Sequence, residues 1–239
     1  MSVAMLKHSV WMFLGRNTYG LRLLNAYVKL IDKDINTTSN RTAIVIEGYP
    51  RCANTRFVAA FRLAQPRQVN IAHHVHGPQQ ILAGLKTNIP VVLLIRSPVE
   101  AVTSLIIRDE SIKPAHAFQN YIKFYKPLLP FIDNLVVSDF EMSTNRIDDV
   151  IHEVNLKYKS IFRTLNEANI NESAIREAVI RMDMVDRGSL VESTKTSGTP
   201  SSERKILAEA LKEEILTEPG LKDLIARSRA IYEQVIRKP

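Results

Sequence analysis

The chain has 239 residues, of which 45% are hydrophobic, with a single cysteine and a formal net charge of +7. A chain of this length can bury one sizeable core, and its one cysteine excludes an intramolecular disulfide framework and a cysteine-built zinc site. The positive charge suits a polyanionic nucleotide, an acidic acceptor or a nucleic acid. Because the basic residues are spread along the chain and no RNA- or DNA-binding motif is present, a nucleic-acid partner is not expected.

Residues 1–35 are expected to form a helical N-terminal extension, in which Leu21, Leu24 and Val28 recur at helical spacing among basic residues. Such a helix usually packs on its own domain, and the alternative is a weak contact of residues 1–31 with an anionic membrane surface. No run of about 18 apolar residues marks a membrane-spanning helix, and no signal peptide is visible. A cytoplasmic location is therefore expected.

The stretch from residue 42 to residue 61 reads TAIVIEGYPRCANTRFVAAF. An apolar run ends at Gly48 and Pro50, a short polar loop follows, and apolar residues recur at helical spacing from Phe57. This order predicts a buried strand, a tight loop and a helix. The first N–H groups of the helix would face the loop and favour an anion such as phosphate or sulfate. The pattern of a Walker loop is absent, and a polar connection without a ligand is the alternative.

A second buried strand is expected over residues 91–95, and it ends at Arg96. Ser97 is a suitable N-cap for the next helix, Glu100 would complete a capping box, and Ser104 would lie about two turns into the helix. An arginine at the carboxyl end of a strand stands where open α/β sheets bind ligands. The alternative is a surface charge without a ligand.

These two segments resemble the family of sulfotransferases that use 3′-phosphoadenosine-5′-phosphosulfate (PAPS). In that family a P-[KR]-S-G-T-T loop binds the 5′-phosphosulfate, and an R-x-P helix start with a serine eight residues after the arginine binds the 3′-phosphate. Here residues 50–55 occupy the first motif, and Arg96, Pro98 and Ser104 reproduce the second. The resemblance covers roughly residues 42–141. It implies an α/β domain of the P-loop NTPase-like sulfotransferase fold, with a mostly parallel sheet flanked by helices.

The resemblance implies that both motifs and a late basic loop hold the cofactor. The implied cofactor-binding residues are Arg51, Cys52, Ala53, Asn54, Thr55, Arg56, Arg96, Ser104, Lys195 and Gly198. Arg51 would clamp the 5′-phosphosulfate, and bacterial-type members often carry arginine there. Arg96 and Ser104 would bind the 3′-phosphate. The loop with Lys195 could equally be a solvated linker, and no metal is expected because no nucleotide triphosphate needs neutralising.

The first motif departs from the family pattern at two positions. Cys52 replaces a serine, so a hydroxyl donor becomes a weak thiol donor. Ala53 replaces a glycine, so a left-handed backbone conformation costs more there. Because Arg51 and a helix N-terminus would both favour the thiolate, Cys52 is expected to have a lowered pKa and to react readily unless nucleotide protects it. A buried, inert thiol is the alternative.

A histidine cluster, His73, His74 and His76, lies between the two motifs. On an extended segment His74 and His76 would share a face and could hold a metal, but no further ligand follows at a convincing spacing. The cluster could also consist of partly exposed side chains beside a strand end. In cytosolic-type sulfotransferases the general base lies about 22 residues ahead of the arginine, which implies His74, with His76 as the reserve. Imidazole can take the proton of an attacking hydroxyl near neutral pH.

The remaining elements are expected to be mainly helical. Helices are expected at residues 114–126, 148–158 and 172–182, a strand at 134–140, a loop at 189–203 and two final helices separated by Pro219 and Gly220. The whole chain is expected to be one domain, with the cofactor-binding core at residues 42–141 and a helical C-terminal part at residues 145–239.

The sequence thus predicts a sulfotransferase that moves a sulfuryl group from PAPS to a hydroxyl acceptor, for example a carbohydrate. A P-loop kinase-like enzyme is one alternative, although the Walker lysine is missing and only Asp139 offers an acidic magnesium ligand at a strand end. A catalytically inactive module that binds a phosphonucleotide or a protein partner is the other. Cys52 and Ala53 motivate this second alternative.

Overall fold

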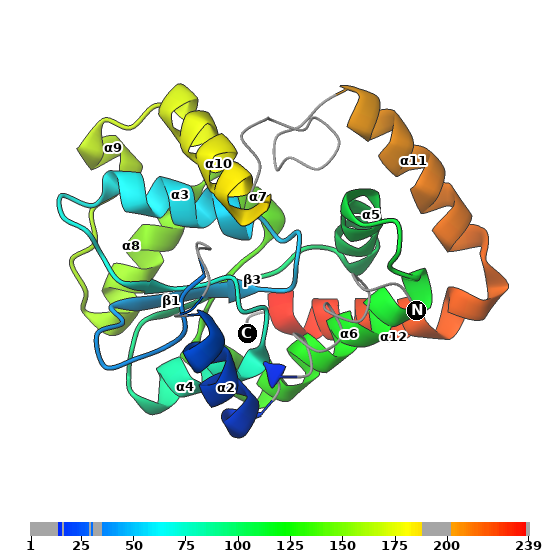
Figure 1. Cartoon of the computed structure of the whole chain (residues 1–239), viewed down its shortest axis with the longest axis horizontal. Helices are drawn as coiled ribbons and strands as arrows, with labels where there is room; N and C mark the ends of the chain where they lie inside the picture. Colours follow the sequence, from blue (N-terminus) through cyan, green and yellow to red (C-terminus); the bar gives the residue numbers. More distant parts are fainter. Residues whose placement is uncertain (1–13, 16, 29, 31–34, 188–201, 238–239) are drawn as a thin grey trace.

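The computed structural model describes the chain except for residues 1–13, 16, 29, 31–34, 188–201 and 238–239 (Figure 1). It is an α/β fold built on a four-stranded parallel sheet. The strands are β1 (Ile44–Gly48), β2 (Ile71–Ala72), β3 (Val91–Leu94) and β4 (Val136–Ser138), in the spatial order β2-β1-β3-β4. The prediction of a mostly parallel sheet flanked by helices is confirmed.

Helices cover both faces of this sheet. They are α2 (Thr18–Val28), α3 (Asn54–Ala64), α4 (Pro78–Lys86), α5 (Pro98–Arg108), α6 (Pro114–Tyr125), α7 (Phe140–Asn145), α8 (Ile147–Tyr158), α9 (Leu165–Ala168), α10 (Glu172–Arg187), α11 (Ser202–Thr217) and α12 (Lys222–Ile236), with 3-10 turns η1 (Lys126–Asn134) and η2 (Pro219–Leu221). In Figure 1, α3 and α10 lie on one side of the sheet and α2 and α4 on the other. At one end of the molecule α11 packs on α5, and α12 packs on α6.

The strands are buried on both faces, as their continuous apolar sequences require. All residues of β1 and β3 are buried, which is the pattern of a parallel sheet covered by helices on both sides. The two strands pair in register from Val45 opposite Val91 to Gly48 opposite Leu94. Among the four described strands, Glu47 is the one ionisable residue, and it is fully buried.

The chain changes direction across the sheet at β1. It runs from β1 through α3 to β2 at one edge, and then through α4 to β3 on the other side of β1. The loops that follow β1 and β3 therefore diverge at the carboxyl edge of the sheet. This switch point is where open α/β sheets bind their ligands.

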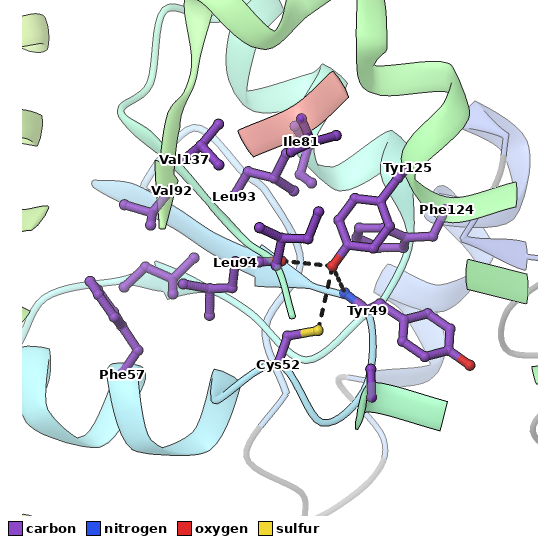
Figure 2. Packing of buried hydrophobic residues seen from close by; sticks show 14 of the residues in the cluster. Tyr49, Cys52, Phe57, Ile81, Val92, Leu93, Leu94, Phe124, Tyr125 and Val137 are labelled. Atoms are coloured by element: carbon purple, nitrogen blue, oxygen red, sulfur yellow. Dashed lines mark hydrogen bonds between the residues drawn. The ribbon is translucent and has the colours of Figure 1, made fainter. Parts of the chain in front are cut away.

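The buried phenol of Tyr125 lies beneath the ends of these two strands (Figure 2). Its hydroxyl donates to the Leu94 carbonyl at 2.8 Å and accepts from the Tyr49 N–H at 3.2 Å. A Cβ at Gly48 would lie only 2.4 Å from the Leu94 carbonyl oxygen, so glycine is required for this close approach of the strands. The positions of the two following loops are thereby fixed relative to each other.

The start of α5 differs from its predicted form. Ser97 is the N-cap residue, but its side chain makes no capping hydrogen bond. The carboxylate of Glu100 instead accepts from Arg96 at 3.3 Å and from Lys212 of α11 at 2.6 Å. The predicted capping box is therefore wrong, because nearby cations attract this carboxylate more strongly than the helix start does.

The C-terminal elements agree with their predictions. The helices expected from residues 114, 148 and 172 correspond to α6, α8 and α10, and the strand expected at 134–140 contains β4. Two final helices, α11 and α12, are separated by η2 at Pro219 and Gly220. Most of the predicted loop at residues 189–203 lies outside the described residues.

Of the predicted N-terminal extension, residues 1–35, the structure describes α2 and a few residues beside it in the sequence. Tyr19, Leu23 and Tyr27 recur on α2 and are exposed. Contact of this region with a membrane surface stays a prediction. Over the described ranges, every helix is too short or too polar to cross a membrane.

Candidate active site

A cavity of about 960 Å³ opens at the carboxyl ends of β1 and β3. Its walls come from the loop between β1 and α3, the histidine segment after β2, and helices α5, α10 and α11. The lining includes Arg51, His74, His76, Arg96, Ser104 and Arg204. The two sequence motifs therefore border one common space.

The loop between β1 and α3 has a strained backbone. Arg51 has a φ of 71°, and Ala53 has a φ of 68° with a ψ of 18°, so both lie in the left-handed region. For a residue with a Cβ this conformation costs about 1–2 kcal/mol. The loop thus adopts at Ala53 the conformation that alanine disfavours, and neighbouring contacts must stabilise it.

Two hydrogen bonds to loop carbonyls provide part of that stabilisation. Asn54 donates through Nδ2 to the Tyr49 carbonyl at 3.1 Å. Arg96 donates to the Arg51 carbonyl at 3.4 Å. The Asn54 side chain therefore supports the loop from within.

The N-terminus of α3 supplies backbone donors for an anion. The first helical hydrogen bond runs from the Phe57 N–H to the Ala53 carbonyl at 2.9 Å. The N–H groups of residues 54–56 consequently have no acceptor within the helix. Together with the positive end of the helix dipole they favour an anion in the loop.

Two arginines from distant parts of the chain meet at the Ser104 hydroxyl. Arg51 donates through Nε to Ser104 Oγ at 3.0 Å, and Arg204 of α11 donates to the same oxygen at 3.0 Å. Ser104 is almost fully buried. The structure thus places Arg51 directly beside Ser104, although the resemblance assigns them to opposite ends of the cofactor.

The positive charges at the site act strongly on one another. Burial lowers the pKa of Arg51 well below its ordinary value, and the charges of Arg204, Arg108 and Arg96 lower it further. Burial is also the main cause that lowers the pKa of Arg96 and of Arg204. A cluster of buried guanidinium groups is costly unless anions compensate its charge.

Carboxylates compensate part of this charge. Arg108 pairs with Asp183 and Asp186 of α10 at 2.9 Å each. Each of the three neighbouring arginines nevertheless affects the pKa of Arg51 more strongly than Asp183 does. The site therefore favours an additional anion.

Arg96 is held in place from several directions. Its guanidinium carbon lies 4.0 Å from the centre of the Phe140 ring, as in a cation–π contact. Its carbonyl accepts from the Tyr121 hydroxyl at 2.8 Å. This packing positions the side chain at the cavity before any ligand binds.

Arg56 is occupied by structural contacts. Its guanidinium donates to both carboxylate oxygens of Glu172 at 2.7 Å. It also donates to the Thr144 carbonyl at 3.0 and 2.8 Å. Arg56 therefore joins α3 to α7 and α10, and its contact with a cofactor stays a prediction.

The Cys52 side chain points into the core (Figure 2). Its sulfur lies 3.4 Å from the Tyr125 hydroxyl, whose own proton is donated to the Leu94 carbonyl. Burial raises the pKa of Cys52 to about 11, although its contact with the Tyr125 hydroxyl and the charges of Arg96 and Arg51 have smaller lowering effects. The predicted lowering of this pKa is wrong, because desolvation outweighs the nearby positive charges.

The histidine segment is not extended, contrary to the expected geometry. β2 ends at Ala72, and His74 and His76 have φ values of 61° and 53°. Their ring centres are 5.6 Å apart, and both side chains line the cavity. Among the described residues, no group of three or more His, Cys, Asp or Glu side chains is arranged to hold a metal ion.

The two rings have different partners. His74 Nε2 lies 3.1 Å from Thr55 Oγ1, and His74 Nδ1 lies 2.6 Å from Nδ1 of buried His73. His76 Nδ1 lies 2.8 Å from the Gly48 carbonyl oxygen and 3.4 Å from a carboxylate oxygen of Glu47. Both histidines thus face the space between the two motifs, as a base for a bound acceptor requires.

Three residues at the site were not among the candidates from the sequence. Arg108 follows Ser104 by four positions, so helical spacing places it beside Ser104 and could have revealed it. Glu47 is a lone acidic residue in an apolar strand, and this pattern in the sequence could also have indicated a functional residue. Arg204 carries no local signal, because it reaches Ser104 only through tertiary packing. Lys195 and Gly198 lie outside the described residues.

Comparison with known proteins gives one structural similarity. Neither a protein-family model nor a curated protein sequence matches the chain. Among solved structures, the chain is similar to the mouse sulfotransferase SULT7A1 complexed with PAP (3′,5′-diphosphoadenosine). The similarity has a TM-score of 0.43 and 8% sequence identity, and covers 92% of this chain and 90% of that chain.

The buried thiol predicts slow alkylation. Because burial raises the pKa of Cys52 to about 11, native protein at pH 7.5 should react with iodoacetamide much more slowly than the unfolded chain. An increase of two pKa units alone lowers the thiolate fraction about 100-fold. The rates can be compared in buffer and in urea by mass spectrometry, since the chain has one cysteine. Equal rates in both conditions would contradict the buried geometry.

The strained backbone at Ala53 predicts a stabilising substitution. Ala53→Gly should raise the free energy of unfolding by about 0.5–1 kcal/mol, because relief of left-handed strain exceeds the entropy cost of glycine. The exposed helical residue Ala226 is the matched control, and Ala226→Gly should lower the same quantity by about 1 kcal/mol. Urea unfolding measures both. A similar loss in the two variants would show that Ala53 is not strained.

Proposed function

We propose that this protein is a sulfotransferase that moves the sulfuryl group of PAPS to a hydroxyl acceptor. The proposal depends on one observation. The carboxyl ends of β1 and β3 are each followed by donors that could bind an anion, and both sets of donors border the same cavity. Arg51 and the α3 N-terminus form the first, and Arg96 and Ser104 at α5 form the second. PAPS carries two anionic groups on one nucleotide, so it suits a pair of adjoining sites, which the hydrogen bond from Arg51 to Ser104 links in the free protein.

The charge distribution supports an anionic cofactor. Burial lowers the pKa of Arg51, and repulsion from the other arginines at the cavity lowers it further. A bound diphosphonucleotide would compensate this repulsion and accept hydrogen bonds from the same donors. Arg51 stands where many sulfotransferases have lysine, and bacterial-type members of that family often carry arginine there.

The chemistry needs positioning and electrostatic stabilisation more than covalent catalysis. The acceptor oxygen attacks sulfur, the bond between sulfur and the phosphate oxygen breaks, and the phosphate leaves with the electron pair. Arg51 and the N–H groups of α3 would stabilise the charge that develops on that phosphate. Arginine stays protonated, so it acts as a charge and not as a proton donor. An imidazole of the His74 and His76 pair would take the acceptor proton.

An inactive nucleotide-binding module is the second candidate. Cys52 favours it, because its side chain packs in the core and gives the loop no hydroxyl donor. A sulfotransferase and an inactive module would both bind the nucleotide, but only the sulfotransferase would turn PAPS over. Release of PAP from PAPS that depends on an added hydroxyl acceptor, for example a sugar or a phenol, separates them.

Nucleotide binding should stabilise the fold without a metal. At about 100 times the Kd, PAP should add about 2.7 kcal/mol to stability, which raises Tm by about 5–10 °C for a chain of this size. Thermal unfolding with PAP and EDTA measures this increase. Stabilisation only by ATP with magnesium would favour a kinase instead. No response to either nucleotide would favour a protein that binds other partners.

The 3′-phosphate contact predicts a selective loss of affinity. Arg96→Ala should weaken PAP binding by about 10- to 100-fold, the loss of a charge-assisted hydrogen bond, and should change AMP binding little. Calorimetry with the two nucleotides measures the difference. Arg146→Ala is the control, because Arg146 is exposed and its ion pair among the described residues is with Asp149, three positions along the chain. Equal losses for PAP and AMP would refute the assignment.

A further inference from the structure

We propose that His76, oriented by the buried carboxylate of Glu47, is the base that takes the acceptor proton, and that His74 is instead a hydrogen-bond donor to Thr55. This inference rests on the proposed sulfotransferase function and deepens it, because it assigns the proton-transfer step to particular ring nitrogens. The offset of about 22 residues from Arg96 favours His74 as the base over His76, and the hydrogen bonds described below favour the reverse.

Glu47 is a carboxylate fixed inside the sheet. It is fully buried, and its Oε1 accepts from the Gly48 N–H at 3.1 Å. Its Oε2 accepts from the Val75 N–H at 2.9 Å and from Gln80 Nε2 at 3.1 Å. An ionised carboxylate only accepts hydrogen bonds, and these three partners only donate. Burial of an acid in a strand is costly, so such a network points to a specific use.

The surroundings of His76 determine its tautomer. Its Nδ1 faces two acceptors, the Gly48 carbonyl at 2.8 Å and Glu47 Oε1 at 3.4 Å. Nδ1 must therefore carry a proton. In the neutral ring the lone pair then lies on Nε2, the nitrogen a base would use. The side chain is 19% exposed and lines the cavity, so a bound acceptor can reach it.

A different chain of hydrogen bonds determines the tautomer of His74. Arg62 lies 2.7 Å from His73 Nε2 and can only donate, so His73 Nε2 accepts. Neutral His73 then carries its proton on Nδ1, which lies 2.6 Å from His74 Nδ1. His74 Nδ1 accepts the hydrogen bond from His73 Nδ1–H. Neutral His74 is therefore protonated on Nε2 and donates to Thr55 Oγ1 at 3.1 Å.

The two histidines consequently have different roles. His74 offers no lone pair at Nε2, so it does not act as a base there. Because it donates to the Thr55 oxygen, the Thr55 hydroxyl proton is directed to another acceptor, such as an oxygen of the phosphosulfate. His74 is thus a positioning residue for Thr55. His76 alone combines a fixed Nδ1 proton with a basic Nε2.

The transfer step balances with these residues. The acceptor oxygen forms its bond to sulfur while its proton moves to His76 Nε2, and the sulfur–oxygen bond to the phosphate breaks. His76 becomes an imidazolium whose charge is stabilised by Glu47. Solvent removes the proton after the products leave. No oxidant, reductant or metal takes part.

The charges around His76 set the pH range of this step. Burial lowers the pKa of His76. The hydrogen bond and charge of Glu47 on β1, the Gly48 carbonyl and Asp186 of α10 together outweigh it, so the net shift is upward. The ring of His74 also faces it, with ring centres 5.6 Å apart. Since the base must be neutral, the rate should fall as the pH drops through this raised pKa.

The tautomers can be measured without any substrate. In ¹⁵N-labelled wild-type protein at pH 8, nitrogen–proton NMR correlations of the histidine rings should show His76 protonated at Nδ1 and His74 protonated at Nε2. The variants His74→Gln and His76→Gln assign the signals, since each removes one set. A neutral His76 with its proton on Nε2 would overturn the proposal. This readout depends on the fold alone, so it stays decisive if PAP fails to bind and the proposed function is wrong.

Turnover then tests the role of each residue. His76→Ala should slow acceptor-dependent PAP release about 100-fold or more with unchanged PAP affinity, and added imidazole should restore part of the rate. His152→Ala is the control, because His152 is exposed on α8. Glu47→Gln, if it retains PAP binding, should move the acid limb of the pH–rate profile to lower pH. Full activity of His76→Ala alongside an inactive His74→Ala would refute the assignment while leaving the sulfotransferase proposal intact.

Discussion

The hydroxyl of Tyr125 joins the ends of β1 and β3, because it donates to the Leu94 carbonyl and accepts from the Tyr49 N–H. The close approach of the strands at Gly48 makes this bridge possible. Both loops that border the cavity leave the sheet within two residues of these atoms. The geometry of the anion sites therefore follows from one buried phenol and one missing side chain. Loss of the hydroxyl would leave a buried N–H and a buried carbonyl each without this partner.

Electrostatic strain is the second constraint on the site. The arginines at the cavity come from the loop after β1, the end of β3, α5 and α11, so only the folded chain brings them together. Burial and repulsion among them lower the pKa of Arg51, and Asp183 of α10 offsets part of the effect. The free protein thus holds positive charge that an anion would stabilise. The contacts that make the unliganded site unfavourable are therefore the ones that a bound polyanion would compensate.

The sequence predicts those parts of the structure that depend on local patterns. Buried strands at residues 44–48 and 91–94, and helices that begin after Ala53 and Ser97, follow from apolar runs and turn residues. The direction of the Cys52 side chain and the reach of Arg204 depend on contacts between distant segments, so local spacing could not give them. The capping box at Ser97 failed for the same reason, since Lys212 lies far along the chain and binds Glu100. The histidine segment turns at His74 and His76, so the expectation of an extended segment with both rings on one face does not describe it.

The two departures from the sulfotransferase motif that residues 50–55 resemble leave the backbone donors of the loop in place. Ala53 bears a left-handed conformation that glycine would adopt freely, and Cys52 packs its thiol against Tyr125 below the loop. Neither change removes a backbone N–H from the start of α3, and neither displaces Arg51 from Ser104. An anion in this loop would be bound by N–H groups and the helix dipole, which do not depend on side-chain identity, together with Arg51. The loop can therefore lack the serine and glycine of the motif and still keep the arrangement of donors that the proposed chemistry requires.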